Sequence, residues 1–391
     1  MAVLGEVPLY GLICLGALIW TWLGYPVWIA TLAFVRLRNA PCAESRSPET
    51  APGSVSVILA VHNGESKLRE RIQNLRECLA DVPWAEIVVG LDGCTDGSSK
   101  ILEALSDGPI PVRVAEGSRR EGKSVAQNRA VAVARGGILL LSDLDTRTDP
   151  GGVNALLKPF QDPSVGFVAG NLGWRSEGEH GLAHVARSYT GFERWLWRQE
   201  SAAGVLHVAP GAFMAMRREL FRPLDPDVGD DAKLPLDVLA CGYRGAFAPA
   251  AHASDRYTTN YKEEFWSRAR MTSRGMRATM RGIARGRLWR RPALLISIVS
   301  HRLLRWTTPA WFLGLVVAIA PMLGGLILAS FLRPWGVAIW TAAAAVLLGT
   351  RQGRRLPARA FAWGVAAGGL LYGVGHYLAR GSIQEYGRGR Q

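Results

Sequence analysis

The sequence has few cysteines, and none of them is close enough to another to form a small metal or redox motif. The five cysteines lie far apart, at positions 14, 42, 78, 94 and 241, and no C-x-x-C pair occurs. A disulfide framework or a structural zinc site needs closer spacing. We therefore predict buried thiols in a reducing cytosol, which excludes a small secreted domain held together by disulfides.

Basic residues are absent before the first long apolar run, which excludes an ordinary cleaved signal peptide. Residues 8–35 are nearly uncharged, with Glu6 before them and Arg36 and Arg38 after them. A signal peptide would begin with basic residues and end at a small-residue cleavage site. The run is long enough to cross a bilayer, and flanking arginines mark the cytosolic side. We predict an uncleaved anchor over residues 1–38 in a bacterial-type inner (cell) membrane, with the domain that follows it in the cytosol.

Apolar runs return near the carboxyl end, at roughly 307–332, 334–350 and 360–379. The first is long enough for a span, the second is short, and the third is diluted by glycines that packed membrane helices tolerate. We predict about three transmembrane segments within 307–379 and a basic tail over 380–391. The protein is then multi-pass, and the side on which its tail lies stays open.

Acidic residues are scarce between positions 256 and 305, where thirteen Lys or Arg face two glutamates. Nucleic-acid binding is one interpretation of such a patch. The patch continues into an apolar segment, however, which favours contact with anionic lipid headgroups. Five arginines recur there at helical spacing and form one face: Arg270, Arg274, Arg277, Arg281 and Arg285. We predict basic interfacial helices over 256–306 that dock on anionic membrane lipids, and no nucleic-acid partner.

Strands and helices alternate between the anchor and the basic region. Residues 39–53, rich in Pro, Ser and charge, predict a linker. The apolar runs 55–61, 86–91 and 138–141 predict buried strands, and helical stretches separate them. This alternation predicts an α/β domain over 54–255, with a mostly parallel sheet covered by helices on both faces.

Carboxylates follow the predicted strands in order. Asp92 comes after the strand at 86–91, Asp143 and Asp145 come after the strand at 138–141, and Asp230-Asp231 lies further along. The carboxyl ends of parallel strands line the crevice where open α/β sheets bind ligands. A D-x-D pair there suits a divalent cation, Mg²⁺ or Mn²⁺, which in turn suits a diphosphate. Each group also has a simpler interpretation. Asp143 and Asp145 could be surface carboxylates, Asp92 could belong to an ordinary turn, and Asp230-Asp231 could be a helix N-cap.

A phosphate-loop pattern competes with this interpretation. Residues 117–124, Gly-Ser-Arg-Arg-Glu-Gly-Lys-Ser, fit G-x-x-x-x-G-K-S letter for letter. The pattern carries bulky charged residues where a backbone would wrap around phosphate, and it leaves Asp92, Asp145 and Asp231 without a role. A P-loop-type nucleotide hydrolase is therefore the less favoured alternative. Both interpretations direct Lys123 at a diphosphate.

Six segments in order resemble the motifs of membrane-anchored family 2 glycosyltransferases with the GT-A fold, over roughly residues 53–310. The first four are Ser56–Glu65 for the opening strand and nucleotide turn, Leu91–Ser98 for D-D-G-S-T-D-G-T, Gly122–Asn128 for G-K-a-x-A-l-N, and Ser142–Thr146 for the metal-binding D-A-D-T. The last two are Gly211–Phe221 for the acceptor-side segment and Asp230–Leu236 for the catalytic E-D-f-x-L. The nucleotide turn departs at the proline and tyrosine of P-x-Y-N-E and adds Gly64.

One departure affects the expected product. Processive synthases of the family carry Q-x-x-R-W. The corresponding residues here, Ser267–Met271, keep the arginine of this motif as Arg270 and lack its glutamine and tryptophan. The missing tryptophan and the few membrane spans favour transfer of one sugar over polymer synthesis and export.

The resemblance implies a role for each site residue. Asp231, with Asp230 beside it, is the expected general base, and Asp145, assisted by Asp143, is expected to bind the metal. The diphosphate contacts fall to Lys123 and Arg270, with Arg268 nearby. The base and ribose fall to Asp92, Asn63 and Glu65.

The resemblance also implies an activity. We expect an inverting hexosyltransferase that moves sugar from a nucleotide-diphospho-sugar, UDP-linked, to a lipid-linked or membrane-associated glycan acceptor. A catalytically inactive, membrane-bound nucleotide-sugar binder is the other alternative.

Overall fold

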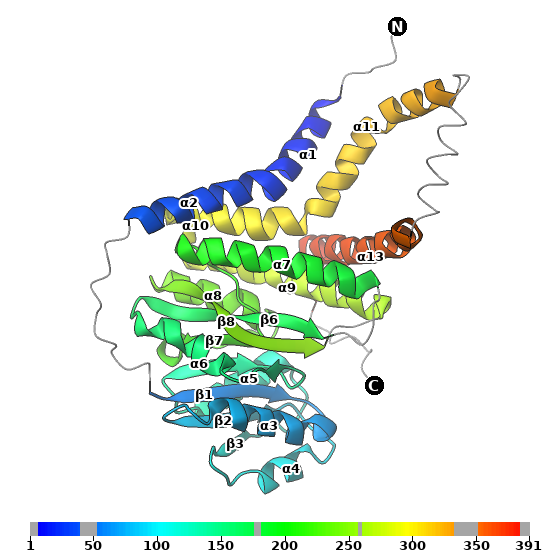
Figure 1. Ribbon diagram of the computed structural model, residues 1–391. Helices are drawn as coiled ribbons and strands as arrows, with labels where there is room; N and C mark the ends of the chain where they lie inside the picture. Colours follow the sequence, from blue (N-terminus) through cyan, green and yellow to red (C-terminus); the bar gives the residue numbers. More distant parts are fainter. Residues whose placement is uncertain (1–6, 40–52, 176–180, 257–259, 332–350, 384–391) are drawn as a thin grey trace.

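The structure is a computed structural model that describes residues 7–39, 53–175, 181–256, 260–331 and 351–383 (Figure 1). Three predicted features fall wholly or mostly outside these residues: the linker at 39–53, the apolar run at 334–350 and the tail at 380–391.

The strands of the described residues form one eight-stranded sheet. In chain order they are β1 (Val55–Val61), β2 (Ala85–Leu91), β3 (Val112–Ala115), β4 (Ile138–Ser142), β5 (Arg147–Thr148), β6 (Val165–Arg175), β7 (Phe213–Arg217) and β8 (Arg244–Arg256). The sheet order is β3-β2-β1-β4-β7-β6-β8-β5. Pairing is parallel from β3 to β4 and between β6 and β8, and antiparallel on both sides of β7 and between β8 and β5. The predicted α/β class with a mostly parallel sheet is confirmed, with an antiparallel insertion at β7.

Helices occupy the connections and the chain ends. Those of the first half are α1 (Leu9–Ile19), the π-helical turn η1 (Trp20–Gly24), α2 (Tyr25–Asn39), α3 (Glu65–Leu79), α4 (Ser98–Ala104), α5 (Lys123–Val133), α6 (Gly152–Leu157) and the 3₁₀ turn η2 (Lys158–Gln161). Those of the second half are α7 (Gly181–Ala202), η3 (Arg218–Leu220), α8 (Asp230–Ala240), α9 (Tyr261–Arg285), η4 (Leu288–Arg290), α10 (Pro292–Ile298), the π-helical turn η5 (Val299–Leu304), α11 (Thr308–Phe331) and α13 (Arg351–Arg380).

Side chains of β1 point alternately into two apolar cores. Val57 and Leu59 pack in the core that contains Leu68 of α3, whereas Ile58 packs in the core that contains Ala130 of α5. Successive strand residues face opposite sides of a sheet. Because helices cover both sides, the strand is apolar on both faces apart from Ser56, instead of alternating with polar residues. Helices on both faces of the sheet were predicted and are observed.

Helix α2, the second half of the long N-terminal helix, is part of the core that contains Ala130. Tyr25, Ile29 and Ala33 recur every four residues along α2 and are at most 1% exposed. They pack with residues of α7 and of the segment that follows it. Figure 1 shows α2 lying beside α10, next to α7. The predicted anchor is therefore fixed to the catalytic domain along one face.

The upper half of that helix leaves the body together with α11 (Figure 1). A Cβ at Gly11 would lie 2.6 Å from the Cβ of Ala318, and one at Gly314 would lie 2.7 Å from the sulfur of Cys14. Such close approach through glycine is common between membrane helices. Exposed apolar side chains cover the outside of the pair, among them Leu9, Leu12, Ile13, Phe312, Leu313 and Val317.

The prediction of a multi-pass protein is not supported. Within the described residues, Leu9–Arg38 is long and apolar enough to cross a membrane alone, and Pro292–Leu304 with Thr308–Met322 passes only as a pair bent by 65°. The glycine-rich segment 360–379 belongs to α13, which does not meet this test. Its Gly369 and Gly373 instead lie against Phe265 and Ala269 of α9. The glycines serve close packing on a neighbouring helix.

We predict that Ile29→Ala lowers the free energy of unfolding by about 2–5 kcal/mol, since it empties a fully buried site. The matched control is Val27→Ala on the same helix, where the side chain is 65% exposed and the expected change is within about 0.5 kcal/mol. Thermal unfolding of both variants in detergent measures the difference. Equal losses would contradict the docking of α2 on the domain.

Candidate functional site

The ammonium of Lys123 contacts two of the carboxylates that the sequence singled out. Its Nζ lies 2.7 Å from Oδ1 of Asp143 and 3.1 Å from Oδ2 of Asp230. Lys123 is the first residue of α5, Asp143 follows β4 and Asp230 begins α8. The three residues come from segments far apart in the sequence, and they meet at the carboxyl edge of β4. This meeting point defines the candidate site.

The two neighbouring aspartates of α8 have opposite environments. Asp230 is buried and accepts a hydrogen bond from Gln127 at 2.7 Å in addition to its contact with Lys123. Although burial opposes ionisation, Lys123 and Gln127 hold the pKa of Asp230 below its usual value. Burial and the adjacent Asp230 raise the pKa of Asp231. Diverging pKa values in a carboxylate pair separate an anchoring group from a proton acceptor.

A third carboxylate lies near the D-x-D pair. Burial, and then Asp143 and Asp145, raise the pKa of Asp255 to about 6. Asp255 is the last but one residue of β8, next to the Ser254 that pairs with Arg147 of β5. The Nζ of Lys67 lies 2.5 Å from Oδ1 of Asp145. Three hard oxygen donors, two of them paired with lysine ammoniums that a divalent cation can displace, fit Mg²⁺ or Mn²⁺ by their chemistry.

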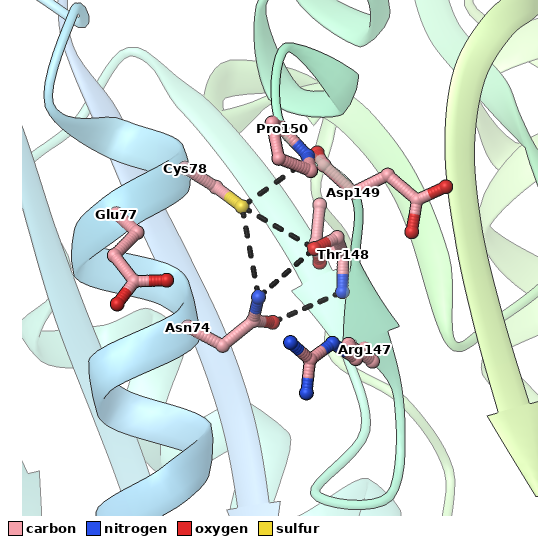
Figure 2. A pocket seen from close by; sticks show the side chains of 7 residues that line it. All are labelled: Asn74, Glu77, Cys78, Arg147, Thr148, Asp149 and Pro150. Atoms are coloured by element: carbon pink, nitrogen blue, oxygen red, sulfur yellow. Dashed lines mark hydrogen bonds between the residues drawn. The ribbon is translucent and has the colours of Figure 1, made fainter.

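Helix α3 braces the segment that carries the D-x-D pair. Figure 2 shows Asn74 facing Thr148 of β5: its Nδ2 donates to the Thr148 carbonyl at 2.9 Å, and its Oδ1 accepts from the Thr148 N–H at 3.0 Å. Arg71, also on α3, donates to the Ser142 hydroxyl at 2.7 Å. The loop is thus held on both sides of Asp143 and Asp145. The pocket in Figure 2 lies between α3 and residues 147–150, at this same contact.

Asp92 is buried and binds the loop that precedes Lys123. Its Oδ1 accepts from the N–H groups of Glu121 and Gly122 at 2.7 and 3.0 Å, and its Oδ2 accepts from Gly122 at 2.9 Å. In a phosphate loop these N–H groups would point at phosphate. Here a carboxylate already occupies them, so the P-loop alternative is wrong.

Asn63 and Glu65 join two neighbouring turns. The Oδ1 of Asn63 accepts from the Thr95 N–H at 2.8 Å, and a carboxylate oxygen of Glu65 accepts from the Gly97 N–H at 2.8 Å. The turn after β1 and the turn after β2 are therefore held side by side. Contact of Asn63, Glu65 and Asp92 with a nucleotide stays a prediction.

Three arginines of the α9 face contact the domain, and docking of this face on anionic lipid stays a prediction. Arg274 donates to the Val228 carbonyl at 2.7 Å and also reaches Ser124, beside Lys123. Arg277 lies 2.8 Å from a carboxylate oxygen of Asp227, and Arg281 contacts the same carboxylate. Helical spacing gave the face correctly, but the face holds the loop that leads to Asp230 and Asp231.

Arg268 and Arg270 were predicted to bind the donor. Arg268 pairs with the buried Glu264 at 2.7 Å, and its Cβ lies against Gly369 of α13. This places Arg268 on the side of α9 that faces α13. Arg270 lies one helical turn before Arg274. The donor contacts of both arginines stay predictions.

Several residues of the site were not expected from the sequence. Two of them contact site carboxylates directly: Lys67 pairs with Asp145 and Gln127 donates to Asp230. The other two act through their charge, Arg274 near Asp231 and Asp255 near the D-x-D pair. Asp255 could have been found, because it lies at the carboxyl end of a strand, close to the place that Asp143 has after β4. Strand β8 was missed, since its small residues lack a clear apolar period. Lys67, Gln127 and Arg274 lie on helices, where sequence gives no indication of the partner.

A second polar cluster lies between α7 and the turn η5. Ligand atoms of Glu200, His207 and His301 lie within 4.8 Å of one another. His301 uses both ring nitrogens, at 2.6 Å from Glu200 and 3.0 Å from Glu193. Arg305 also pairs with Glu193. With both nitrogens of His301 facing carboxylates, this cluster is an ion-pair network, and it binds η5 to α7.

Comparison with known proteins identifies relatives of the sheet domain. The family described as glycosyl transferase family 2 matches residues 56–224. Succinoglycan biosynthesis protein ExoU of Rhizobium meliloti is 28% identical over 34% of this chain and 37% of its own length. Glycosyltransferase AglD of Haloferax volcanii is 27% identical over 54% of this chain and 35% of its own length. Probable glycosyltransferase YdaM of Bacillus subtilis is 24% identical over 66% and 64%. The chain thus spans between about a third and two thirds of these relatives.

One solved structure resembles nearly the whole chain. Mannosyltransferase PcManGT from Pyrobaculum calidifontis, in complex with GDP-Man and Mn²⁺, superposes with a TM-score of 0.65 at 21% identity, over 95% of this chain and 99% of that one. The likeness shows a shared GT-A-like fold that includes the helices outside the sheet.

We predict that Asp92→Asn destabilises the fold by about 1–3 kcal/mol, because the amide NH₂ cannot accept from a buried N–H of the 121–122 loop. The exposed Asp107→Asn is the matched control and should be neutral. Thermal unfolding without nucleotide measures both. An unchanged melting temperature in Asp92→Asn would show that the carboxylate does not hold this loop.

Proposed function

We propose that this chain, which belongs to glycosyltransferase family 2, moves a single hexose from a nucleoside-diphosphate sugar to a lipid-linked or membrane-associated glycan acceptor, with inversion at C1. We take the donor to be UDP-linked and the catalytic domain to face the cytosol. The observation that carries the proposal is the contact of Lys123 with Asp143 and Asp230. It joins the D-x-D segment to the segment of the expected base.

Asp231 acts as the general base. The hydroxyl oxygen of the acceptor bonds to C1 of the donor sugar as the bond from C1 to the phosphate oxygen breaks. The nucleoside diphosphate leaves with that electron pair, and the hydroxyl proton passes to Asp231. A raised pKa suits this role, since a stronger base accepts the proton more readily. Asp230 stays ionised against Lys123 and keeps the start of α8 in place.

Asp143, Asp145 and Asp255 would hold the divalent cation. A bound Mg²⁺ or Mn²⁺ supplies positive charge to the diphosphate as it leaves. Lys123 and Lys67 contact the two D-x-D carboxylates, and a cation bound there would let both ammoniums contact phosphate oxygens while Lys123 keeps its pair with Asp230. Positive groups fixed in place before the reaction stabilise developing negative charge most effectively.

The proximity of the site to apolar helices supports a lipid-linked acceptor. Arg302 of η5 contacts the backbone of Asp231, and the same stretch of chain continues into α11 with its exposed apolar side chains. Single transfer is supported by the sequence Ser267–Met271, which lacks the glutamine and tryptophan of processive enzymes.

We predict that Asp231→Asn lowers kcat by ~10²- to 10⁴-fold and leaves donor binding unchanged. In the wild type kcat should fall as the pH drops through the pKa of Asp231, which lies above that of an ordinary aspartate. The matched control is Asp237→Asn on the same helix, where a partly exposed pair with Lys233 is lost. Release of nucleoside diphosphate from UDP-glucose, UDP-galactose or GDP-mannose by detergent-purified protein measures turnover. Wild-type turnover in Asp231→Asn excludes this base, and no turnover of any donor favours the inactive-binder alternative.

We predict that EDTA abolishes the rise in melting temperature that a nucleotide sugar and Mn²⁺ produce together, because ligand binding stabilises the folded state. Asp145→Ala should abolish it equally, and Asp255→Asn should reduce it. Asp149→Asn, an exposed residue just beyond β5, is the control. A rise that is the same with and without EDTA would exclude the metal.

A further inference from the structure

Arg302 is a buried cation of the turn η5 that reaches the catalytic segment. It is 4% exposed, and its guanidinium has four acceptors. Nη1 donates to the Ala232 carbonyl at 3.3 Å and to the Thr279 hydroxyl at 3.1 Å. Nη2 donates to the carbonyls of His207 at 2.8 Å and Asp231 at 3.4 Å. One side chain thus joins α8, α9 and the segment after α7 at the point where α8 begins.

A proline in α8 explains why a donor is needed there. In an α-helix the carbonyl of Asp231 would accept from the N–H of the residue four positions later. That residue is Pro235, which lies inside the helix and has no N–H. A buried carbonyl without a partner is costly. Arg302 supplies the missing donor from another part of the chain.

The conformation of η5 presents Arg302 to the domain. This turn is π-helical, and its consecutive residues Ser300, His301 and Arg302 are all buried. Short π-helical turns inside helices are frequent at functional sites. His301 lies between Glu193 and Glu200. These contacts keep η5, and therefore the guanidinium, in place.

From these contacts we propose that Arg302 is a positioning residue for sugar transfer: it replaces the helix donor that Pro235 removes and so holds Asp231 in the orientation in which it accepts the proton. This inference rests on the proposed function. The charged groups around Asp231 are Asp230 of α8, Lys123 of α5, Arg274 of α9 and Arg302 itself. Arg302 therefore also contributes positive charge beside the base.

Two variants of Arg302 separate its geometry from its charge. Arg302→Met removes both and should lower kcat by about 10- to 100-fold, the scale of a small misplacement of a catalytic group, with donor binding kept. Its pH profile should shift as well. Since the guanidinium charge lowers the pKa of Asp231, its loss raises that pKa and moves the acid limb of kcat to higher pH. Arg302→Lys keeps the positive charge but loses the paired Nη1 and Nη2 donors. We therefore expect kcat to fall while the acid limb of its pH profile stays near the wild-type position.

Pro235→Ala provides a rescue that a merely structural role would not give. Alanine restores the N–H four residues after Asp231. In the Arg302→Met background it should recover most of kcat without returning the acid limb, because the charge is still missing. The single variant Pro235→Ala is the baseline for this comparison. No recovery in the double variant would overturn the positioning role.

Arg291→Gln is the matched control for a general effect on α8. Arg291 donates to the Leu239 carbonyl at 3.0 Å and so binds the other end of the same helix. It should leave the pH profile unchanged. Equal effects of Arg291→Gln and Arg302→Met on kcat and pH profile would overturn the inference. If Asp231→Asn turns over donor like the wild type, or no donor is turned over, the proposed function fails and the inference fails with it. If Asp231→Asn is inactive and Arg302→Met behaves as wild type, only the inference fails.

Discussion

The site depends on one ammonium group placed between two carboxylates. Lys123 at the start of α5 contacts Asp143 after β4 and Asp230 at the start of α8. Like charges repel one another at short range, so the acidic residues gather around a common point only because a cation stands between them. The rest of the arrangement serves this contact. Asp92 holds the loop before Lys123, α3 holds the loop after β4, and Gln127 orients Asp230.

The helices outside the sheet are part of the site. The arginines of α9 hold the loop from Asp225 to Val228, and Arg302 of η5 holds the first turn of α8. The N-terminal helix packs through Tyr25, Ile29 and Ala33 in the apolar core that also contains residues of α8. A displacement of the helices that continue into α1 and α11 would therefore move the backbone of Asp231. This is a physical reason for these helices and the sheet domain to fold as one body.

Sequence reasoning located the carboxyl ends of β2 and β4 correctly and assigned helix faces poorly. The apolar runs ending before Asp92 and Asp143 are strands β2 and β4, because residues buried on both sides of a sheet form continuous apolar runs. The arginine period in α9 and the glycines of α13 were also real patterns. A helical period gives a face but not the surface opposite it. The arginines turned out to face Asp225 and Asp227, and the glycines turned out to face α9. Long-range partners such as Pro235 with Arg302 leave no local signal at all.

The polar network under η5 is better explained by precise placement than by stability. Removing charges from water is costly, and a buried ion pair often does no more than offset that cost. Glu193, Glu200, His301 and Arg305 nevertheless lie buried or nearly buried between α7 and η5. An apolar core could fill the same space but would tolerate sliding of one helix along the other. Directional ion pairs tolerate little sliding. Since η5 also carries Arg302, a network that fixes its register fixes the donor to Asp231, whereas an apolar contact of equal strength would not.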